Sequence, residues 1–277
     1  MIGLGTLRLI VTRTGESELL RRDNYRGASI PVVGGIPIIV VAILGMTVLR
    51  IVRSLTELEV FADQALIWVE PALVALLVVA VFGLLDDSMG SAAAKGFRGH
   101  IGSLLSGRLT TGMLKLLAGG LAGLVVASSL ETNLGWLILG GLCVAVWSNV
   151  GNLFDLAPGR CLKVCVPLPL VLVALFPGRL APLALVVGAA MAVFASDVKE
   201  KVMLGDTGAN PAGVLVALAA VACGNHWVTA AFCLGGVLLN LSAERVSFSR
   251  IIYRTSALRR VDLWGTLPER RQFLAEQ

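Results

Sequence analysis

The chain has 277 residues, of which 56% are hydrophobic and only 15% are charged. Soluble proteins are about half apolar and about a quarter charged, so this composition excludes an ordinary soluble protein. The apolar residues come in blocks of about 17–22 residues, the length at which a helix crosses a hydrocarbon layer about 30 Å thick. We therefore expect an all-α fold, a polytopic transmembrane helical bundle with about eight or nine spans.

The apolar blocks follow one another along the chain with short polar breaks. The first block, residues 1–11, is about half as long as a spanning helix and predicts a short first helix. Polar triplets at 131–133, 177–179 and 224–226 predict tight turns between antiparallel helices. The full spans are expected over residues 32–49, 66–85, 112–129, 134–149, 162–176, 180–194, 211–223 and 227–241, so that residues 1–241 form one multi-span membrane domain.

Lysines and arginines predict the orientation. If the spans alternate, nearly all basic loop residues fall on one side, and only Arg50, Arg53 and Arg179 fall on the other. Cytoplasmic loops carry such an excess, so the first side, with the C-terminus, is expected to be cytoplasmic. The net charge of +5 therefore indicates orientation, and we expect no nucleic-acid partner.

Residues 242–277 combine arginines with apolar residues at roughly helical spacing. This pattern predicts a basic amphipathic tail on the cytoplasmic side, either lying on anionic lipid or simply enforcing the topology. The cysteines lie in or beside apolar runs and are expected to be small buried residues. His226 falls on the opposite face, and no role is assigned to it.

The second long span ends in two adjacent carboxylates, Asp86 and Asp87. Adjacent carboxylates repel each other, so the pair indicates a metal ion or another cation beside it. The alternative is a solvated acidic end of a helix.

A second group of polar residues, Asn149, Asn152 and Asp155, recurs every three residues after another span. This spacing places their oxygens on one side of a helix end, where they could serve a metal, a nucleotide or a sugar. Such residues also cap helices and begin turns, and Pro158-Gly159 nearby favours that alternative.

A third motif, Gly205-Asp206-Thr207-Gly208, leads into the span at 211–223. Glycine lets a backbone approach a ligand closely, and a helix start with Pro211 near its first turn offers free N–H groups to phosphate. Asp206 is a candidate Mg²⁺ ligand. The alternative is a simple cap, in which Asp206 or Asn210 accepts backbone hydrogen bonds.

All three acidic motifs fall on the predicted cytoplasmic face, although no aspartate entered the topology. Carboxylates for a metal beside cations for phosphate oxygens suit a divalent cation with a polyphosphate. Taken alone, His100 is more often an ordinary loop histidine. The basic groups expected on this face near the acids are Lys95, Arg98, His100, Arg108 and Lys115.

The motifs together resemble the polyprenyl-phosphate N-acetylhexosamine-1-phosphate transferase superfamily, which includes the phospho-MurNAc-pentapeptide translocase and the GlcNAc-1-phosphate transferases. The resemblance covers about residues 22–213. It rests on residues 24–27 with Gly34-Gly35, on Asp86-Asp87, on the segment around Lys115, on the pattern Asn149-x-x-Asn152-x-x-Asp155, and on residues 205–208.

The resemblance implies a bacterial plasma membrane enzyme that uses Mg²⁺, with Mn²⁺ as a substitute. It implies transfer of a sugar-1-phosphate from a UDP-sugar to polyprenyl phosphate with release of UMP, in cell-envelope glycan synthesis, and it suggests a homodimer. The roles it implies are catalytic for Asp86, Asp87 and Lys115, metal-binding for Asp206 and Asp155, and substrate-binding for Asn149, Asn152, Gly205, Thr207, Arg98, His100 and Arg108.

The sequence departs from the family pattern at three places. Pro158 stands where the pattern has a second aspartate, no histidine follows His226, and the first helix is short. A catalytically weakened homologue that binds a lipid phosphate or acts as a scaffold is therefore an alternative. An ion-coupled transporter is disfavoured, because transporter sites lie near the bilayer midplane and these acids lie at one face.

Overall fold

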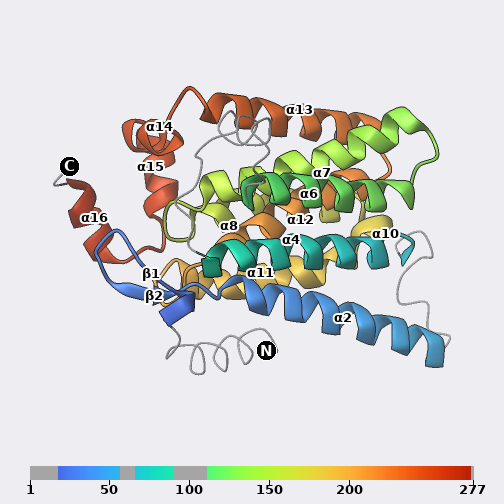
Figure 1. Ribbon diagram of the computed structural model, residues 1–277, viewed down its shortest axis with the longest axis horizontal. Coiled ribbons are helices and arrows are strands. Elements are labelled where there is room, and N and C mark those ends of the chain that lie inside the picture. Colours follow the sequence, from blue (N-terminus) through green and yellow to red (C-terminus); the bar gives the residue numbers. More distant parts are fainter. Residues whose placement is uncertain (1–17, 57–65, 90–110, 276–277) are drawn as a thin grey trace.

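The computed structural model describes residues 18–56, 66–89 and 111–275, and within them the chain is mostly helical, with two short strands. Figure 1 shows the long helices lying side by side along one axis. The helices of the bundle are α2 (Gly35–Thr56), α4 (Val69–Met89), α6 (Thr111–Ser128), α7 (Leu134–Phe154), α8 (Arg160–Cys165), α9 (Pro167–Leu175), α10 (Pro177–Leu180), α11 (Leu183–Asp197), α12 (Asp206–Ala222) and α13 (His226–Ala243).

Helix α12 lies at the centre of the bundle. Every residue from Thr207 to Ala222 is buried, and α12 packs against α7, α4, α13 and α2. A helix that is apolar on all sides is expected in such a place.

Small residues allow the central helices to approach closely. A Cβ added to Gly213 of α12 would overlap the carbonyl oxygen of Trp147, and one added to Gly151 of α7 would overlap that of Ala209. Side chains larger than hydrogen would push α7 and α12 apart, so these glycines set the spacing of the two helices.

The outer helices expose apolar residues. Leu44 and Val48 of α2, and Leu234 and Leu238 of α13, are each about half exposed or more. Four helices in the described residues are long and apolar enough to cross a membrane, at residues 35–52, 69–88, 134–154 and 226–243. The all-α membrane character agrees with the sequence, whereas the expected number of eight or nine spans is not confirmed.

Each expected span is helical over most of its length, but several of the helices are short. The range 162–176 consists of α8 and α9, which meet at Pro167, because proline has no N–H to continue the helical ladder. Helix α12 begins at Asp206 rather than at Pro211, which lies inside the helix.

The expected turns at residues 131–133 and 224–226 are present, whereas the one expected at 177–179 is not. Asn133 caps α7 and Asn225 caps α13, each by accepting two backbone hydrogen bonds. His226 lies 2.5 Å from a carboxylate oxygen of Glu131, and its ring stacks on Trp136. The residues 177–179 fall in the short helix α10.

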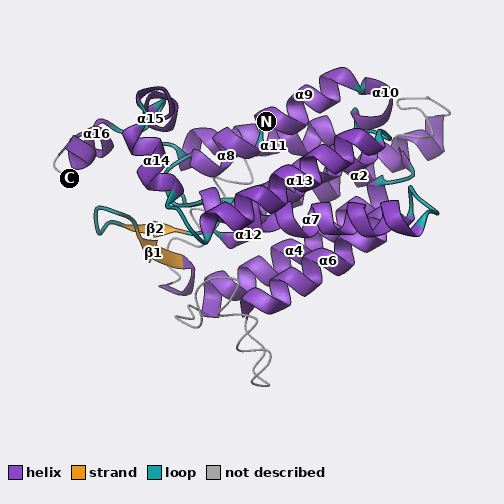
Figure 2. Ribbon diagram, turned by 90° about the horizontal axis from the view of Figure 1, so that it is seen from above, coloured by secondary structure: helices purple, strands orange, loops and turns teal. Residues whose placement is uncertain are grey.

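The hairpin and the tail helices lie at the end of the bundle that is farther from α10, as both views show (Figures 1 and 2). A short 3-10 helix, η1 (Glu18–Leu20), precedes an antiparallel hairpin of β1 (Arg21–Asp23) and β2 (Ser29–Pro31). The tail, expected as one amphipathic helix, forms α14 (Phe248–Arg254), α15 (Ser256–Leu263) and α16 (Pro268–Ala275).

Candidate functional site

The aspartate pair at the end of α4 lies against the start of α12. The carboxylate of Asp87 accepts hydrogen bonds from the backbone N–H groups of Asp206 and Thr207, at 3.0 and 2.9 Å, and from the Thr207 hydroxyl at 2.6 Å. The next two N–H groups, of Gly208 and Ala209, bond to the carbonyl of Gly205. Asp87 therefore caps α12 from a different helix, and the acceptor expected from Asp206 or Asn210 is supplied by Asp87 instead.

This capping changes one expectation for the site. The first N–H groups of α12 were predicted to be free for a phosphate, but these four are already bonded within the protein. The prediction of free donors at these positions is therefore wrong.

Glycines make the contact between α4 and α12 sterically possible. A Cβ added to Gly83 would overlap the carbonyl of Asp206, and one added to Gly205 would overlap Val32 and approach the Asp87 carboxylate. Gly205 also has a φ of 66°, which side-chain-bearing residues rarely adopt. The motif at 205–208 thus needs glycine at its first position for both conformation and space.

Asp155 joins the same site from the end of α7, immediately after the candidate span that ends at Phe154. Burial, and next the negative charge of Asp87, raise the pKa of Asp155 to about 7, although a hydrogen bond with the Gly205 backbone acts in the opposite direction. The structure therefore brings together residues from all three acidic motifs. Two nearby carboxylates that disfavour each other's charge provide a favourable place for a cation.

The carboxylates fit a magnesium ion as partial rather than complete ligands. Asp86 and Asp206, the chain neighbours of Asp87 and Thr207, are half-buried, and their carboxylates are hard oxygen donors like that of Asp155. Among the described residues, no group of three His, Cys, Asp or Glu side chains is arranged to hold a metal alone. Mg²⁺ is usually held by one or two carboxylates together with waters and substrate phosphates, and a pair such as Asp155 and Asp206 would supply that number.

The two asparagines of the second motif lie differently. Asn149 donates from its amide to Asn240 of α13 at 2.5 Å, so this contact ties α7 to α13 instead of facing the aspartates. Asn152 is half-buried in the last turn of α7, and its carbonyl accepts the N–H of Asp155. Within this motif, Asn149 therefore contributes to helix packing, whereas Asp155 lies at the site.

The side chains of several predicted basic residues lie outside the part of the chain that the structure describes. Lys95, Arg98, His100 and Arg108 lie outside the described residues, and Lys115 lies in the first turns of α6, where only the backbone is described. A basic residue that the motifs did not single out reaches the site instead. Arg22 of β1 is half-buried and donates to the carbonyl oxygen of Asp87.

Asp197 is a buried acid that no sequence motif indicated. It ends α11, is 4% exposed, and accepts a hydrogen bond from the N–H of Gly159 at 3.2 Å. Gly159 follows Pro158, the position at which the family pattern has an aspartate. A carboxylate from α11 thus lies next to the loop that has Pro158 in place of an aspartate. Only the three-dimensional structure reveals this placement.

The hairpin turn that carries part of the family resemblance surrounds Glu200. This carboxylate accepts hydrogen bonds from Asn24 at 2.7 Å and from Tyr25 at 2.7 Å, and it pairs with Arg26 at 2.7 Å. Burial, with the neighbouring Glu200, raises the pKa of Tyr25 to about 12. The segment 24–26 therefore fixes the loop that leads into residues 203–208.

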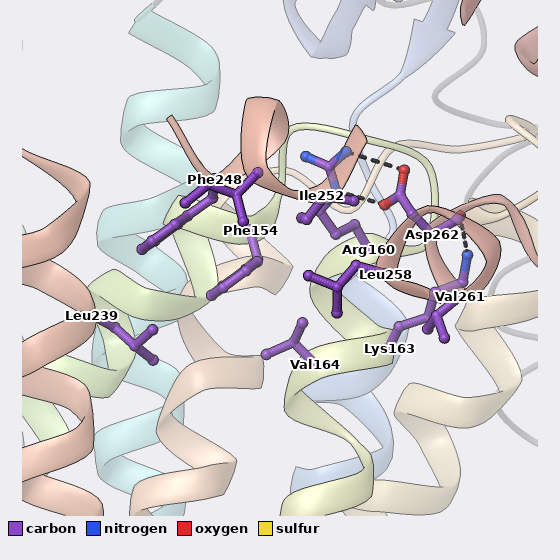
Figure 3. Close-up of a pocket in the computed structure, with 11 residues that line it drawn as sticks. Phe154, Arg160, Lys163, Val164, Leu239, Phe248, Ile252, Leu258, Val261 and Asp262 are labelled. Atoms are coloured by element: carbon purple, nitrogen blue, oxygen red, sulfur yellow. Dashed lines mark hydrogen bonds and ion pairs between the residues drawn. The ribbon is translucent and has the colours of Figure 1, made fainter. Parts of the chain in front are cut away.

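The tail is fixed to the bundle through Arg160 and Asp262. Both side chains are 3% exposed, and Nε and Nη2 of Arg160 donate to the two Asp262 oxygens at 2.6 and 3.1 Å. Lys163 donates to the Asp262 carbonyl (Figure 3). An apolar cavity lies beside this pair, and its volume is about 280 Å³. Phe154, Val164, Leu239, Phe248 and Leu258 are among the lining residues drawn in Figure 3.

The five cysteines are buried, as expected for small apolar residues. No known family model matches the sequence, and no curated protein matches it.

Proposed function

We propose that the protein transfers a sugar-1-phosphate from a UDP-sugar to polyprenyl phosphate at the cytoplasmic face of a bacterial plasma membrane, in synthesis of a cell-envelope glycan. The observation that carries the proposal is the meeting of three acidic motifs: Asp87 caps α12 at Asp206 and Thr207, and its charge acts on Asp155. These residues are far apart in sequence, and each comes from a motif of the resembled family.

The location of the site also supports a lipid substrate. Asp86 and Asp87 end α4, and Asp155 directly follows α7, and both helices are long and apolar enough to cross a membrane. Acids at the ends of such helices lie at the depth of lipid headgroups, where the phosphate of a polyprenyl chain would also lie.

The reaction joins two phosphates. An oxygen of the acceptor phosphate attacks the β-phosphorus of the UDP-sugar, the bond from this phosphorus to the bridging oxygen breaks, and UMP leaves with that oxygen. Asp86 would orient the acceptor phosphate, and Asp87 would hold the start of α12 in register beside it. The principal contribution of the protein is alignment and charge neutralisation.

Asp155 and Asp206 would hold Mg²⁺. The ion, when bound, neutralises phosphate charge during transfer. Arg22 adds a guanidinium near Asp87, and Lys115, predicted from the sequence, would add an ammonium to the phosphates. Asn152 would hydrogen-bond the nucleotide or sugar.

The test is an assay of the purified full chain with Mg²⁺, undecaprenyl phosphate and a panel of UDP-sugars, with UMP and lipid-linked product both measured. We expect turnover with at least one donor and its loss in Asp206→Asn. Asp23→Asn, which changes an exposed acid of the hairpin, is the matched control and should keep full activity.

A second candidate is a weakened homologue that binds a lipid phosphate or serves as a scaffold. Pro158, in place of the acid of the family pattern, favours it. Saturable binding of undecaprenyl phosphate without UMP release from any donor would support this candidate over the enzyme.

A further inference from the structure

A cavity of about 460 Å³ lies among the three tail helices, on the end of the bundle that carries the aspartates. Helix α14 contributes Arg250, Tyr253 and Arg254, α15 contributes Arg259, and α16 contributes Leu274. This volume is in the range of small-molecule sites, which extends from about 300 to about 1,000 Å³. Three of the five lining side chains are guanidinium groups.

Among the described residues, the arginines of this cavity have no acidic partner. Arg250, Arg254 and Arg259 are exposed, and none pairs with a carboxylate in the part of the chain that the structure describes. Arg250 and Arg254 are one helical turn apart, a spacing at which like charges repel. A bound anion would relieve this repulsion.

Tyr253, which lines the cavity, is held in place by buried residues. The hydroxyl of Tyr253 accepts hydrogen bonds from Arg160 at 2.9 Å and from Arg270 at 2.8 Å, and both arginines are buried. Asp262 is the acid that pairs with these two arginines. The cavity is therefore built on a rigid base with an excess of positive charge, as suits anion binding.

The cavity lies close to the membrane surface. Helix α13 is a candidate span that ends at Ala243, and α14 begins at Phe248. Val261 and Trp264, on and just after α15, are more than half exposed. Short helices that combine exposed apolar residues with arginines lie in the interfacial layer, where phosphate headgroups are found.

We propose that Arg250, Arg254 and Arg259 form a binding site for a phosphate-bearing anion, separate from the aspartate site. Guanidinium forks bind phosphate oxygens in pairs, and three of them suit a phosphomonoester or a diphosphate. Two sources share this chemistry, the headgroup of an anionic lipid and a free diphosphate in solution. The site does not depend on the proposed transferase reaction.

The experiment measures binding to the purified full chain in neutral detergent micelles. One arm titrates sodium pyrophosphate by calorimetry, and the other titrates dioctanoyl phosphatidic acid by native mass spectrometry. The test variant is Arg254→Gln with Arg259→Gln. The control is Arg245→Gln with Arg271→Gln, which removes the same charge from exposed tail positions that do not line the cavity.

We expect the cavity variant to weaken binding of at least one probe by about tenfold or more, because charge-assisted hydrogen bonds are lost. The control should bind within about twofold of the unchanged protein. The probe that responds identifies the source of the phosphate. Absence of binding by both probes, or equal weakening in the two variants, would overturn the proposal. Thermal melting of each variant checks that these exposed substitutions leave the fold intact.

Discussion

Thr207 and Asp87, which are 120 residues apart in sequence, are joined twice, because the Thr207 N–H and its hydroxyl both donate to one carboxylate oxygen, Oδ2. This connection makes the end of α4 part of the start of α12, the buried central helix. The acid of the first motif therefore has a structural function whatever chemistry occurs beside it.

Replacing Asp87 with alanine should lower the free energy of unfolding by about 1–3 kcal/mol, because two N–H groups and a hydroxyl lose their acceptor. Hydrogen exchange at residues 206–209 should accelerate at the same time. Asp87→Asn, which keeps one acceptor oxygen, should lose less. Equal stability of Asp87→Ala and Asp23→Asn would refute the capping function.

Gly83→Ala should separate α4 from α12, because the added methyl group overlaps the Asp206 carbonyl. Overpacking of this kind costs about 1–3 kcal/mol, and denaturant unfolding in micelles measures it. Gly120→Ala on α6 is the control, since a Cβ there meets nothing within 4 Å. A change in stability no larger than the control's would show that the contact can relax.

The raised pKa of Asp155 predicts how the stability of the metal-free protein depends on pH. Its pKa is about 7 in the folded protein and about 4 in the unfolded chain, so the folded state favours the neutral acid. The resulting stabilisation is complete below about pH 4 and is lost as the pH rises through about 7. In EDTA, the melting temperature should therefore fall between about pH 5 and about pH 8, and less so in Asp155→Asn.

Magnesium should reverse this trend if Asp155 is a ligand, because metal binding requires the ionised carboxylate and releases protons. Added Mg²⁺ should raise the melting temperature more at about pH 8 than at about pH 5. An equal effect at both values, or in Asp155→Asn, would exclude Asp155 from the metal site.

Breaking the buried pair of Arg160 and Asp262 should release the tail. Asp262→Asn leaves Arg160 buried without its counter-charge, which costs about 3–5 kcal/mol, and limited proteolysis within residues 244–275 should become faster. The exposed pair of Arg50 and Glu70 provides the comparison, because Glu70→Gln should cost about 0–1 kcal/mol. A tail that stays protected in Asp262→Asn would contradict the anchoring function.

The sequence predicted the helices well because apolar length alone marks them. Every expected span is helical over most of its range, and the expected turns at Asn133 and Asn225 are helix caps. Helix length was less predictable, since Pro167 interrupts one expected span and α12 begins before Pro211.

The candidate site was predicted in outline and not in its contacts. The alternation of the apolar spans placed Asp87, Asp155 and Asp206 on one face, but local sequence cannot indicate that an acid on α4 caps α12. The sequence did not indicate Asp197 and Arg22, because each reaches the site from an element that carries no acidic motif. Such contacts depend on packing between distant segments, for which one sequence contains no local signal.

The most direct test of the central claim uses a UDP-sugar labelled with ³²P at the β-phosphate, with undecaprenyl phosphate and Mg²⁺. The account predicts that the label enters the lipid fraction while unlabelled UMP is released, and that Asp206→Asn abolishes both while Asp23→Asn keeps both. Label that stays in the aqueous fraction with every donor tested, or transfer that persists in Asp206→Asn, would contradict it.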